Sequence, residues 1–399
     1  MTQKILFLSA VLLAAGSWAQ SQSPYIYKVY DYAPAPGQFI NELPEYEPGD
    51  TKSDMIRKAD EAIANNNRGM ISLGGYGGYV LFGFDHLVEN KAGRYDFKVM
   101  GNAFVANANP NPEAPRDGGS CEPGIVMVAY DANGNGLPDD PWYELAGSEY
   151  GRPTTIHDYR ITYHRPDEDK LREPDPDYRY INDLTYLRWT TNGHGDGYLF
   201  RNIFHNQPYY PQWLDDDSLV FSGTKLADNY VDESGNGSYY VQYAYPWGYV
   251  DNFPNADLRS GLSIEWAVDG EGKAVHLPGI HFVKVYTGVN QYCGWLGETS
   301  TEILGAEDLH LTGGDAFIAT ANSAPIRPEN SLRLLQSPVR KQLLIYSGKE
   351  QTVEVYGMSG SRLASLRLQR GTNSIDCSLP PGIYVLRANR QAIKFLKAE

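Results

Sequence analysis

Short apolar or alternating runs recur along the chain, and clusters of turn residues separate them. Four of these runs have the pattern of strands that line a core: 74–84, 94–104, 123–131 and 279–289. In 94–104 the alternation points Tyr95, Phe97 and Val99 inward. The chain has 40 Gly and 30 Tyr, which favour turns and strands over helices. The sequence therefore predicts a mainly β protein.

One short N-terminal segment has a helical pattern instead. Thr51 stands three residues before Asp54, as in a capping box, and three consecutive Asn residues at 65–67 end the segment. Apolar residues recur on one of its faces: Met55, Ala59, Ala62 and Ile63. We expect this helix to pack on a sheet and to carry no chemistry.

Residues 20–322 form the expected body of the protein, which is long enough for an ample hydrophobic core. Within it, 150–260 is polar, charged and rich in aromatic residues, without strong periodicity. A stretch of this length predicts an insertion of hairpins and loops, or a distinct subdomain. Because binding and catalytic residues usually lie on such loops, we expect function there.

The tail from Ser331 to Glu399 differs from the body in charge and in pattern. It has 11 Lys and Arg against 4 Asp and Glu, whereas the chain without this tail and without Lys4 has 22 against 45, a net charge of −23. Short strands alternate with turns in the tail: 343–346, 353–356, 364–368, 383–388 and 392–396. This spacing predicts a small Ig-like β-sandwich over 333–399, after a linker at 323–332. The acidic body argues against nucleic acid and anionic membrane surfaces as partners.

The first 19 residues have the pattern of a secretory signal peptide. Lys4 precedes an apolar run at 5–15, and Ser17 and Ala19 take the −3 and −1 positions of a cut before Gln20. This run is far shorter than the ~20 apolar residues that a membrane helix needs. No later stretch is long and apolar enough, so no transmembrane segment is expected.

The tail also resembles the C-terminal sorting domain of the type IX secretion system of Bacteroidetes. Its segments read SPVRKQLLI, VEVYGMSGSRL and GTNSIDCSLPPGIYVLRA. The most specific part is an L-P-x-G-x-Y-x-L core: Leu379, Pro380, Gly382, Tyr384 and Leu386. The chain ends in KFLKAE, where the family often has a Lys-Ile-Ile/Val strand. The resemblance implies recognition by the secretion machinery, export through the periplasm, and release or surface attachment with loss of the tail. An ordinary Ig-like accessory domain is the alternative.

Three blocks of the body resemble a group of secreted bacterial cell-surface proteins: GGYVLFGFDHLVENKAGRYDFKVMGNAF, SCEPGIVMVAYDANGNGLPDDPWYELAGSEY and IHFVKVYTGVNQYCGWLGETSTEILGAEDL. The match covers 69–150 and 279–312 and leaves the middle uncovered. It implies a large jelly-roll-like β-sandwich, here with the insertion at 150–260, and no established catalysis.

The run 131–140, DANGNGLPDD, has the spacing of a calcium-binding loop. Oxygen donors fall at loop positions 1, 3, 5, 7 and 9: Asp131, Asn133, Asn135, the carbonyl of Leu137, and Asp139. Gly136 allows the sharp turn, but Trp142 replaces the bidentate Glu of an EF-hand at position 12. We expect Ca²⁺ to bind here as a structural staple; the alternative is an Asn-Gly turn between two strands.

Aromatic residues in the insertion are candidates for binding a flat ligand such as a sugar ring: Tyr209, Tyr210, Trp213 and Trp247. Alternatively, these side chains pack the insertion onto the sandwich. Cys121 and Cys293 are candidates for a disulfide, which export would permit.

Catalytic signals are sparse, since neither H-E-x-x-H nor G-x-S-x-G occurs, and no residue is assigned a catalytic role. Three functions stay open: a non-catalytic surface protein that binds a glycan or another nutrient, a secreted glycan hydrolase, and a structural surface or adhesin component. A cleft with two buried carboxyl groups of altered pKa would favour the hydrolase, and an open aromatic platform would favour binding.

Overall fold

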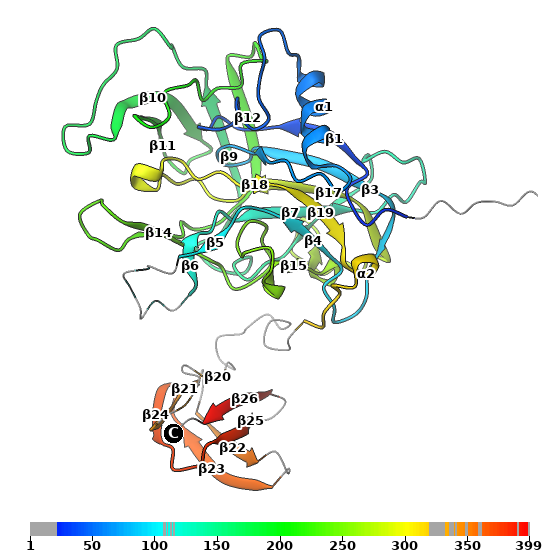
Figure 1. Cartoon of the computed structure of the whole chain (residues 1–399), viewed down its shortest axis with the longest axis vertical. Coiled ribbons are helices and arrows are strands. Elements are labelled where there is room, and N and C mark those ends of the chain that lie inside the picture. Colours follow the sequence, from blue (N-terminus) through cyan, green and yellow to red (C-terminus); the bar gives the residue numbers. More distant parts are fainter. Residues whose placement is uncertain are drawn as a thin grey trace, which may run out of the picture. The chain divides into compact units, whose positions relative to one another are not determined.

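The computed structural model describes residues 22–106, 109, 111, 114, 116–318, 332–334, 339, 341–347, 350–357, 361–388 and 391–397. Strands hold 44% of the described residues and helices 7%, and the sheets are antiparallel, so the prediction of a mainly β, sandwich-rich protein is confirmed. The chain divides into two compact units, Met1–Asn322 and Ser323–Glu399 (Figure 1). The predicted signal peptide at 1–19 and most of the predicted linker at 323–332 lie outside the described residues.

A six-stranded antiparallel sheet forms the centre of the first unit. In spatial order its strands are β1 (Lys28–Ala33), β3 (Tyr79–Glu89), β17 (Gly279–Thr287), β7 (Gly124–Ala129), β8 (Trp142–Leu145) and β16 (Ala267–Val268). Val283 of β17 stands opposite Phe82 on one side and Val128 on the other. The strands predicted around 74–84, 123–131 and 279–289 are therefore neighbours in this sheet.

Both faces of the central sheet are covered, which explains why its strands are apolar almost throughout. On one face Phe82, Val128 and Val283 join a core with residues of a three-stranded sheet. This sheet consists of β15 (Gly261–Leu262), β4 (Phe97–Met100) and β19 (Gly305–Asp308). As predicted, Phe97 and Val99 of β4 are buried, and so is Tyr95 just before it. A short helix, α2 (Leu309–Thr312), follows β19.

The predicted N-terminal helix is α1 (Lys52–Ile63), and it lies against β1 (Figure 1). The capping box is formed, because the Thr51 side chain accepts a hydrogen bond from the amide of Asp54 while the Asp54 carboxylate accepts one from the amide of Thr51. Met55, Ala59 and Ile63 are buried in the same core as β4.

The other face of the central sheet packs on the predicted insertion, which folds into hairpins. Four strands form its sheet, in the order β11 (Asp196–Asn202), β10 (Ile181–Thr191), β9 (Ile156–His164) and β12 (Ser218–Lys225). Tyrosines dominate the core between the two sheets, including Tyr163 from β9 and Tyr286 from β17. The hydroxyl of Tyr163 donates a hydrogen bond to the carbonyl of Tyr76, so this wide aromatic core also satisfies a buried polar atom.

The first unit also contains two small antiparallel sheets. One has the order β13 (Tyr230–Asp232), β14 (Tyr240–Tyr243), β6 (Gly118–Ser120) and β5 (Phe104–Val105). The other pairs β18 (Glu302–Ile303) with β2 (Ile71–Ser72). Short 3₁₀ turns at Leu258–Ser260, Ile264–Trp266 and Gly294–Leu296 connect the longer elements.

The second unit contains two antiparallel sheets with one shared core. Their strands are β20 (Leu332–Leu334), β21 (Gln342–Ser347) and β24 (Gly371–Asp376) in one sheet, and β23 (Arg362–Leu368), β22 (Gln351–Gly357), β25 (Gly382–Ala388) and β26 (Gln391–Lys397) in the other. Leu343, Val355 and Leu386 are buried between them. Among the described residues of the whole chain, no helix is long and apolar enough to cross a bilayer.

Candidate functional site

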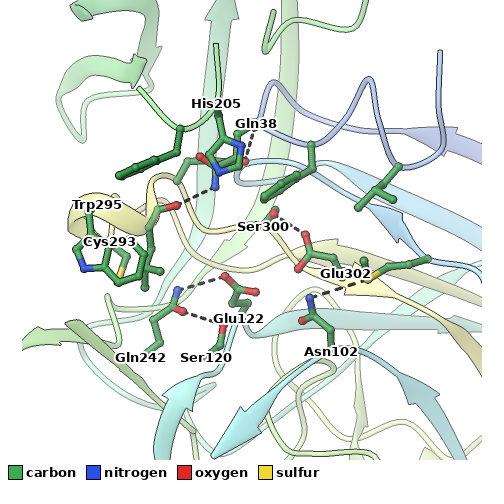
Figure 2. A pocket seen from close by; sticks show the side chains of 16 residues that line it. Gln38, Asn102, Ser120, Glu122, His205, Gln242, Cys293, Trp295, Ser300 and Glu302 are labelled. Carbon is green, nitrogen blue, oxygen red and sulfur yellow. Dashed lines mark hydrogen bonds between the residues drawn. The ribbon is translucent and has the colours of Figure 1, made fainter. Parts of the chain in front are cut away.

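A cavity of about 320 Å³ in the first unit has an acidic floor and an apolar rim (Figure 2). Polar and carboxyl side chains line it together with aromatic and aliphatic ones: Gln38, Asn102, Ser120, Glu122, His205, Gln242, Cys293, Glu298, Ser300 and Glu302, with Phe39, Leu43, Met70, Phe204, Trp295 and Leu296. In Figure 2, Glu122 lies beside Ser120 and Gln242, across the cavity from His205 and Gln38. The site is thus assembled from segments far apart in the sequence.

Glu122 occupies the bend between β6 and β7. Its amide donates a hydrogen bond of 2.8 Å to the carbonyl of Asp251, and Gly124 and Val250 next to them form a bridge with two main-chain hydrogen bonds. These contacts fix the backbone of Glu122 against the segment that carries Asp251. The Gln242 side chain lies 3.5 Å from the Glu122 carboxylate.

Asp251 has a left-handed backbone conformation, with φ of 54°. Asp is one of the few residues other than Gly that adopt this conformation readily. One carboxylate oxygen accepts a hydrogen bond of 2.7 Å from the amide of Ala103, and the other accepts one of 3.0 Å from the amide of Glu302. Gly101 is needed beside it, because a Cβ atom there would lie 2.3 Å from Asp251 Oδ1.

Glu302 begins β18 and stands opposite Ser72 of β2. Its Oε1 atom accepts hydrogen bonds from the hydroxyls of Ser72 (3.0 Å) and Ser300 (2.6 Å). Strand pairing and two hydroxyl donors therefore hold this carboxyl group in one orientation.

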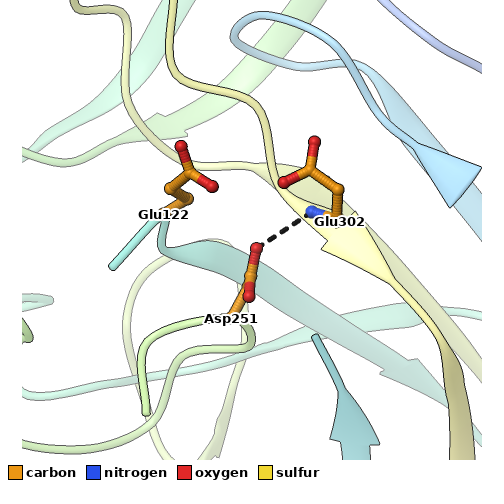
Figure 3. A group of neighbouring side chains, drawn as sticks. All are labelled: Glu122, Asp251 and Glu302. Atoms are coloured by element: carbon orange, nitrogen blue, oxygen red, sulfur yellow. Dashed lines mark hydrogen bonds between the residues drawn. The ribbon is translucent and has the colours of Figure 1, made fainter. Parts of the chain in front are cut away.

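The carboxyl groups of Glu122, Asp251 and Glu302 converge, and one oxygen of each lies within 4.8 Å of the others (Figure 3). Burial raises the pKa of all three groups, and the charge of Glu302 raises the pKa of Glu122 and Asp251 further.

Glu298 is a buried carboxyl group that lines the cavity together with Glu122 and Glu302, whereas Asp251 lies beside them outside the lining. Its Oε1 atom accepts a hydrogen bond of 3.0 Å from the amide of Gln38. Its other oxygen and the side-chain oxygen of Gln38 are buried and have no hydrogen-bond partner among the described residues. Burial raises the pKa of Glu298 well above its ordinary value, and the charge of Glu302 adds to this.

No ion pair supplies positive charge to this floor from the described residues. Within the described part of the chain, none of the four carboxyl groups forms an ion pair with Lys, Arg or His. The lining contains one basic side chain, His205, whose pKa is lowered by burial, so that its neutral form is favoured.

The rim of the cavity presents two exposed aromatic side chains. Phe204, just after β11, is 63% exposed, and Trp295, in the 3₁₀ turn before Glu298, is 41% exposed. Phe39 packs edge-on against His205 with ring centres 4.8 Å apart. Flat apolar faces therefore stand beside buried oxygen acceptors.

The aromatic residues predicted to bind a ligand do not line this cavity. Tyr209 and Tyr210 are buried in the tyrosine-rich core, where the Tyr209 hydroxyl accepts a hydrogen bond from the amide of Asn202. Trp213 is half-buried and stacks on Tyr32. Trp247, also half-buried, packs against Trp266 with ring centres 4.7 Å apart.

The structure does bring together the side chains of the predicted calcium loop. Asp131 accepts hydrogen bonds from three loop amides, those of Gly134, Asn135 and Gly136, and these lower its pKa. The amides of Asn133 and Asn135 both donate to the Asp139 carboxylate, at 3.2 and 3.0 Å. Gly136 has φ of 71°, as the predicted sharp turn requires, and the Leu137 amide donates to Asn135.

Cys121 and Cys293, the predicted candidates for a disulfide, are both free and buried. Burial raises the pKa of the Cys121 thiol to about 12 and also raises that of Cys293. Both thiols are therefore protonated at neutral pH and poorly reactive.

The three acidic residues of the floor and the adjacent Asp251 were not predicted as a site from the sequence. Glu122, Glu298 and Glu302 lie inside two of the blocks that resemble cell-surface proteins, in the words SCEPG and GETSTEI. The available signal was a set of carboxylates directly beside strands that are buried on both faces. Asp251 offered no comparable signal, because it lies in the polar insertion where acidic residues are common.

No protein-family model matches the chain, and no curated protein sequence matches it. The function must therefore be inferred from the chemistry of the cavity.

Proposed function

We propose that the chain is an exported cell-surface protein that binds a glycan or another polyhydroxylated nutrient in the acidic cavity, without catalysis. The observation that carries this proposal is the combination of buried oxygen acceptors on the floor with exposed aromatic rings on the rim. The cavity volume of about 320 Å³ falls at the lower end of the range for small-ligand sites, roughly 300–1,000 Å³. One or two sugar rings are the appropriate size.

Each part of the cavity suits one part of a sugar. The hydroxyl groups would donate hydrogen bonds to the unpaired oxygens of Gln38 and Glu298. The apolar face of a ring would lie on Trp295 or Phe204. These contacts also explain why the cavity combines apolar and strongly polar lining.

Glycan hydrolysis is the second candidate, because buried carboxyl groups with raised pKa are what a general acid requires. The spacing argues against it. Glycosidase carboxyl groups stand ~5–10 Å apart, on either side of the scissile bond. One carboxyl oxygen of Glu122 lies within 4.8 Å of one carboxyl oxygen of Glu302, which is closer than this range.

Binding is tested with a glycan array and a small-ligand screen on the purified protein, followed by titration calorimetry with the best ligand. Replacing Phe204 by Ala is expected to weaken binding about 10-fold, as loss of a stacking contact does. Phe317→Ala is the matched control, since Phe317 is 70% exposed and does not line the cavity. Equal affinity of the Phe204→Ala and Phe317→Ala proteins would contradict the assignment of the cavity.

Cleavage of any glycan in the same screen would favour the hydrolase instead. Glu122→Gln then separates the two functions. In a hydrolase this variant loses turnover while it keeps binding, whereas in a binding protein no turnover is present to lose.

Export is proposed because residues 1–19 have the pattern of a signal peptide and the tail at 333–399 resembles a sorting domain. If the type IX secretion machinery removes the tail, the mature surface or culture-fluid protein ends near the boundary between the two units, at residues 322 and 323. Mass spectrometry of the protein from its native host measures this end. A mature protein that still contains Glu399 would exclude the sorting function of the tail.

The loop at 131–139 is proposed to hold a structural Ca²⁺ ion. Support comes from the convergence of Asp131, Asn133, Asn135 and Asp139, which is the donor set of the predicted site. The test is the melting temperature with and without millimolar Ca²⁺, compared between the natural protein and Asp139→Asn. Equal shifts in the two proteins would exclude this loop as the source of the stabilisation.

A further inference from the structure

The floor of the cavity concentrates negative charge where water is largely excluded. Asp251, Glu298 and Glu302 are 3–4% exposed, and Glu122 converges on two of them. Buried carboxyl groups need a compensating cation or must bind protons, because ionised groups are costly to remove from water. The described residues supply no cationic side chain to them, as shown above. Their compensation must therefore come from outside the chain or from protons.

The three converging groups are oriented in the manner of metal ligands. The main-chain amides of Ala103 and Glu302 hold Asp251, and the hydroxyls of Ser72 and Ser300 hold Glu302, so three of these four donors belong to residues outside the cluster. Such outer hydrogen bonds are typical of ligand carboxylates, whose geometry must be fixed before an ion binds. In Figure 3 the three carboxyl groups point toward one common space. Each oxygen that faces this space keeps a lone pair for a cation.

A second, independent observation points to an occupant of this space. The Oε2 atom of Glu298 and the Oε1 atom of Gln38 lack a hydrogen-bond partner among the described residues, and both side chains are 96% buried. Buried acceptors are almost always satisfied in folded proteins, by protein groups or by ordered water. Both residues line the cavity that Glu122 and Glu302 line. Water molecules bound to a cation would supply donors to them.

We propose that Glu122, Asp251 and Glu302 bind one divalent cation, Ca²⁺, at the floor of the cavity. The donors are all hard carboxylate oxygens, which suit Ca²⁺ and exclude a preference for Zn²⁺ or copper. Three carboxylates leave several of the 6–8 positions of Ca²⁺ for water or for the hydroxyls of a ligand. The proposal is independent of the loop at 131–139 and does not require that the cavity bind a glycan.

The two calcium sites are separated by matched substitutions in the full chain. Glu302→Gln removes charge from the cavity floor, keeps the shape of the side chain and keeps an oxygen that accepts from Ser72 and Ser300. Asp139→Asn makes the corresponding change in the loop. Metal is first removed with EDTA, and each variant is then titrated with CaCl₂ in a calorimeter. We expect Asp139→Asn to bind Ca²⁺ at the cavity site. We expect Glu302→Gln to bind Ca²⁺ at the cavity site at least 10-fold more weakly.

Terbium luminescence gives a readout that does not depend on stability. Trp295 lines the cavity, so its excitation would sensitise Tb³⁺ bound at the floor. In the Asp139→Asn background, Trp295→Phe is expected to remove most of this signal while Ca²⁺ binding persists. This pair keeps the proposal testable even if Glu302→Gln does not fold.

The proposal is overturned if the Asp139→Asn protein binds no Ca²⁺ at millimolar concentration. It is also overturned if folded Glu302→Gln binds with unchanged affinity and stoichiometry. Tighter binding of MgCl₂ than CaCl₂ by Asp139→Asn would overturn the choice of Ca²⁺.

Discussion

The carboxylate of Asp251 accepts a hydrogen bond of 3.0 Å from the main-chain amide of Glu302, 51 residues further along the chain. Through its other oxygen the same carboxylate accepts from the amide of Ala103, 148 residues before it. Asp251 therefore joins three segments around the cavity floor. Both donors are main-chain amides, so the structural role of Asp251 can be measured separately from any role in binding an ion.

We expect Asp251→Ala to lower the free energy of unfolding in EDTA by about 2–4 kcal/mol, because two buried amides lose their acceptor and Ala is strained at positive φ. Asp251→Asn is expected to lose less than half as much. Asn tolerates the left-handed conformation and keeps one acceptor oxygen. Urea unfolding measures both values. A loss below about 0.5 kcal/mol for Asp251→Ala would show that these hydrogen bonds do not hold the segments together.

Glu144 on β8 predicts a specific dependence of stability on pH. Burial raises its pKa from 4.5 to about 7, although the Thr224 hydroxyl donates a hydrogen bond of 2.6 Å to it. Between these two pH values the unfolded chain loses the proton while the folded protein keeps it, so stability falls as pH rises. Glu144→Gln removes this effect, and at pH 8 it should be more stable than the natural protein by up to about 3 kcal/mol.

The measurement for Glu144 is the difference in unfolding free energy between the two proteins from pH 4 to pH 8. This difference isolates Glu144 from the other titrating groups of the chain. We expect it to grow mainly between about pH 4.5 and 7 and to be constant above that range. A difference independent of pH would show that Glu144 ionises normally in the folded protein.

The buried thiols give a prediction about chemical reactivity. Cys121 and Cys293 are free and have raised pKa values, so they should react with Ellman's reagent at least 100-fold more slowly in the folded protein than in guanidinium chloride. Without reductant, all three cysteines, including Cys377, should titrate in the denatured protein. Titration of only one thiol there would show that Cys121 and Cys293 pair after all.

Tyr209 and Phe204 distinguish packing from ligand binding within one segment. Tyr209→Phe removes a hydroxyl that accepts from the amide of Asn202 and donates to the carbonyl of His205. It should therefore cost about 1–2 kcal/mol of stability with little change in ligand affinity. Phe204→Ala should show the opposite pattern, since Phe204 is exposed at the rim. Calorimetric affinity and thermal melting, measured on both variants, provide the comparison.

Local patterns predicted the elements of this fold well. The capping box at Thr51 predicted α1, and the apolar runs predicted β3, β7 and β17. Both kinds of pattern lie within a few neighbouring residues and can be recognised in one sequence. The β-bridge that holds Glu122 beside Asp251 depends on the pairing of Gly124 with Val250, more than 100 residues apart. No periodicity within either segment reports such a pairing, so the carboxylate cluster was not predictable from one sequence.

The insertion shows why composition alone did not identify the residues that line the cavity. Its many aromatic residues suggested a sugar-binding surface, but the second face of the central sheet needed covering, and Tyr209 and Tyr210 pack in that core. Only the exposed fraction separates these tyrosines from Phe204. The exposed fraction depends on the tertiary structure, whereas aromatic residues occur in both settings.

Phe204 at the rim of the cavity follows a hairpin that carries none of the carboxyl groups of the floor. Glu122, Asp251 and Glu302 belong to segments that pair with one another, whereas Phe204 follows a hairpin of the insertion. Substitutions or length changes in that hairpin can therefore alter which molecule enters while the acidic floor is inherited unchanged. Such a division lets related proteins diverge in selectivity without rebuilding the buried acidic part of the site.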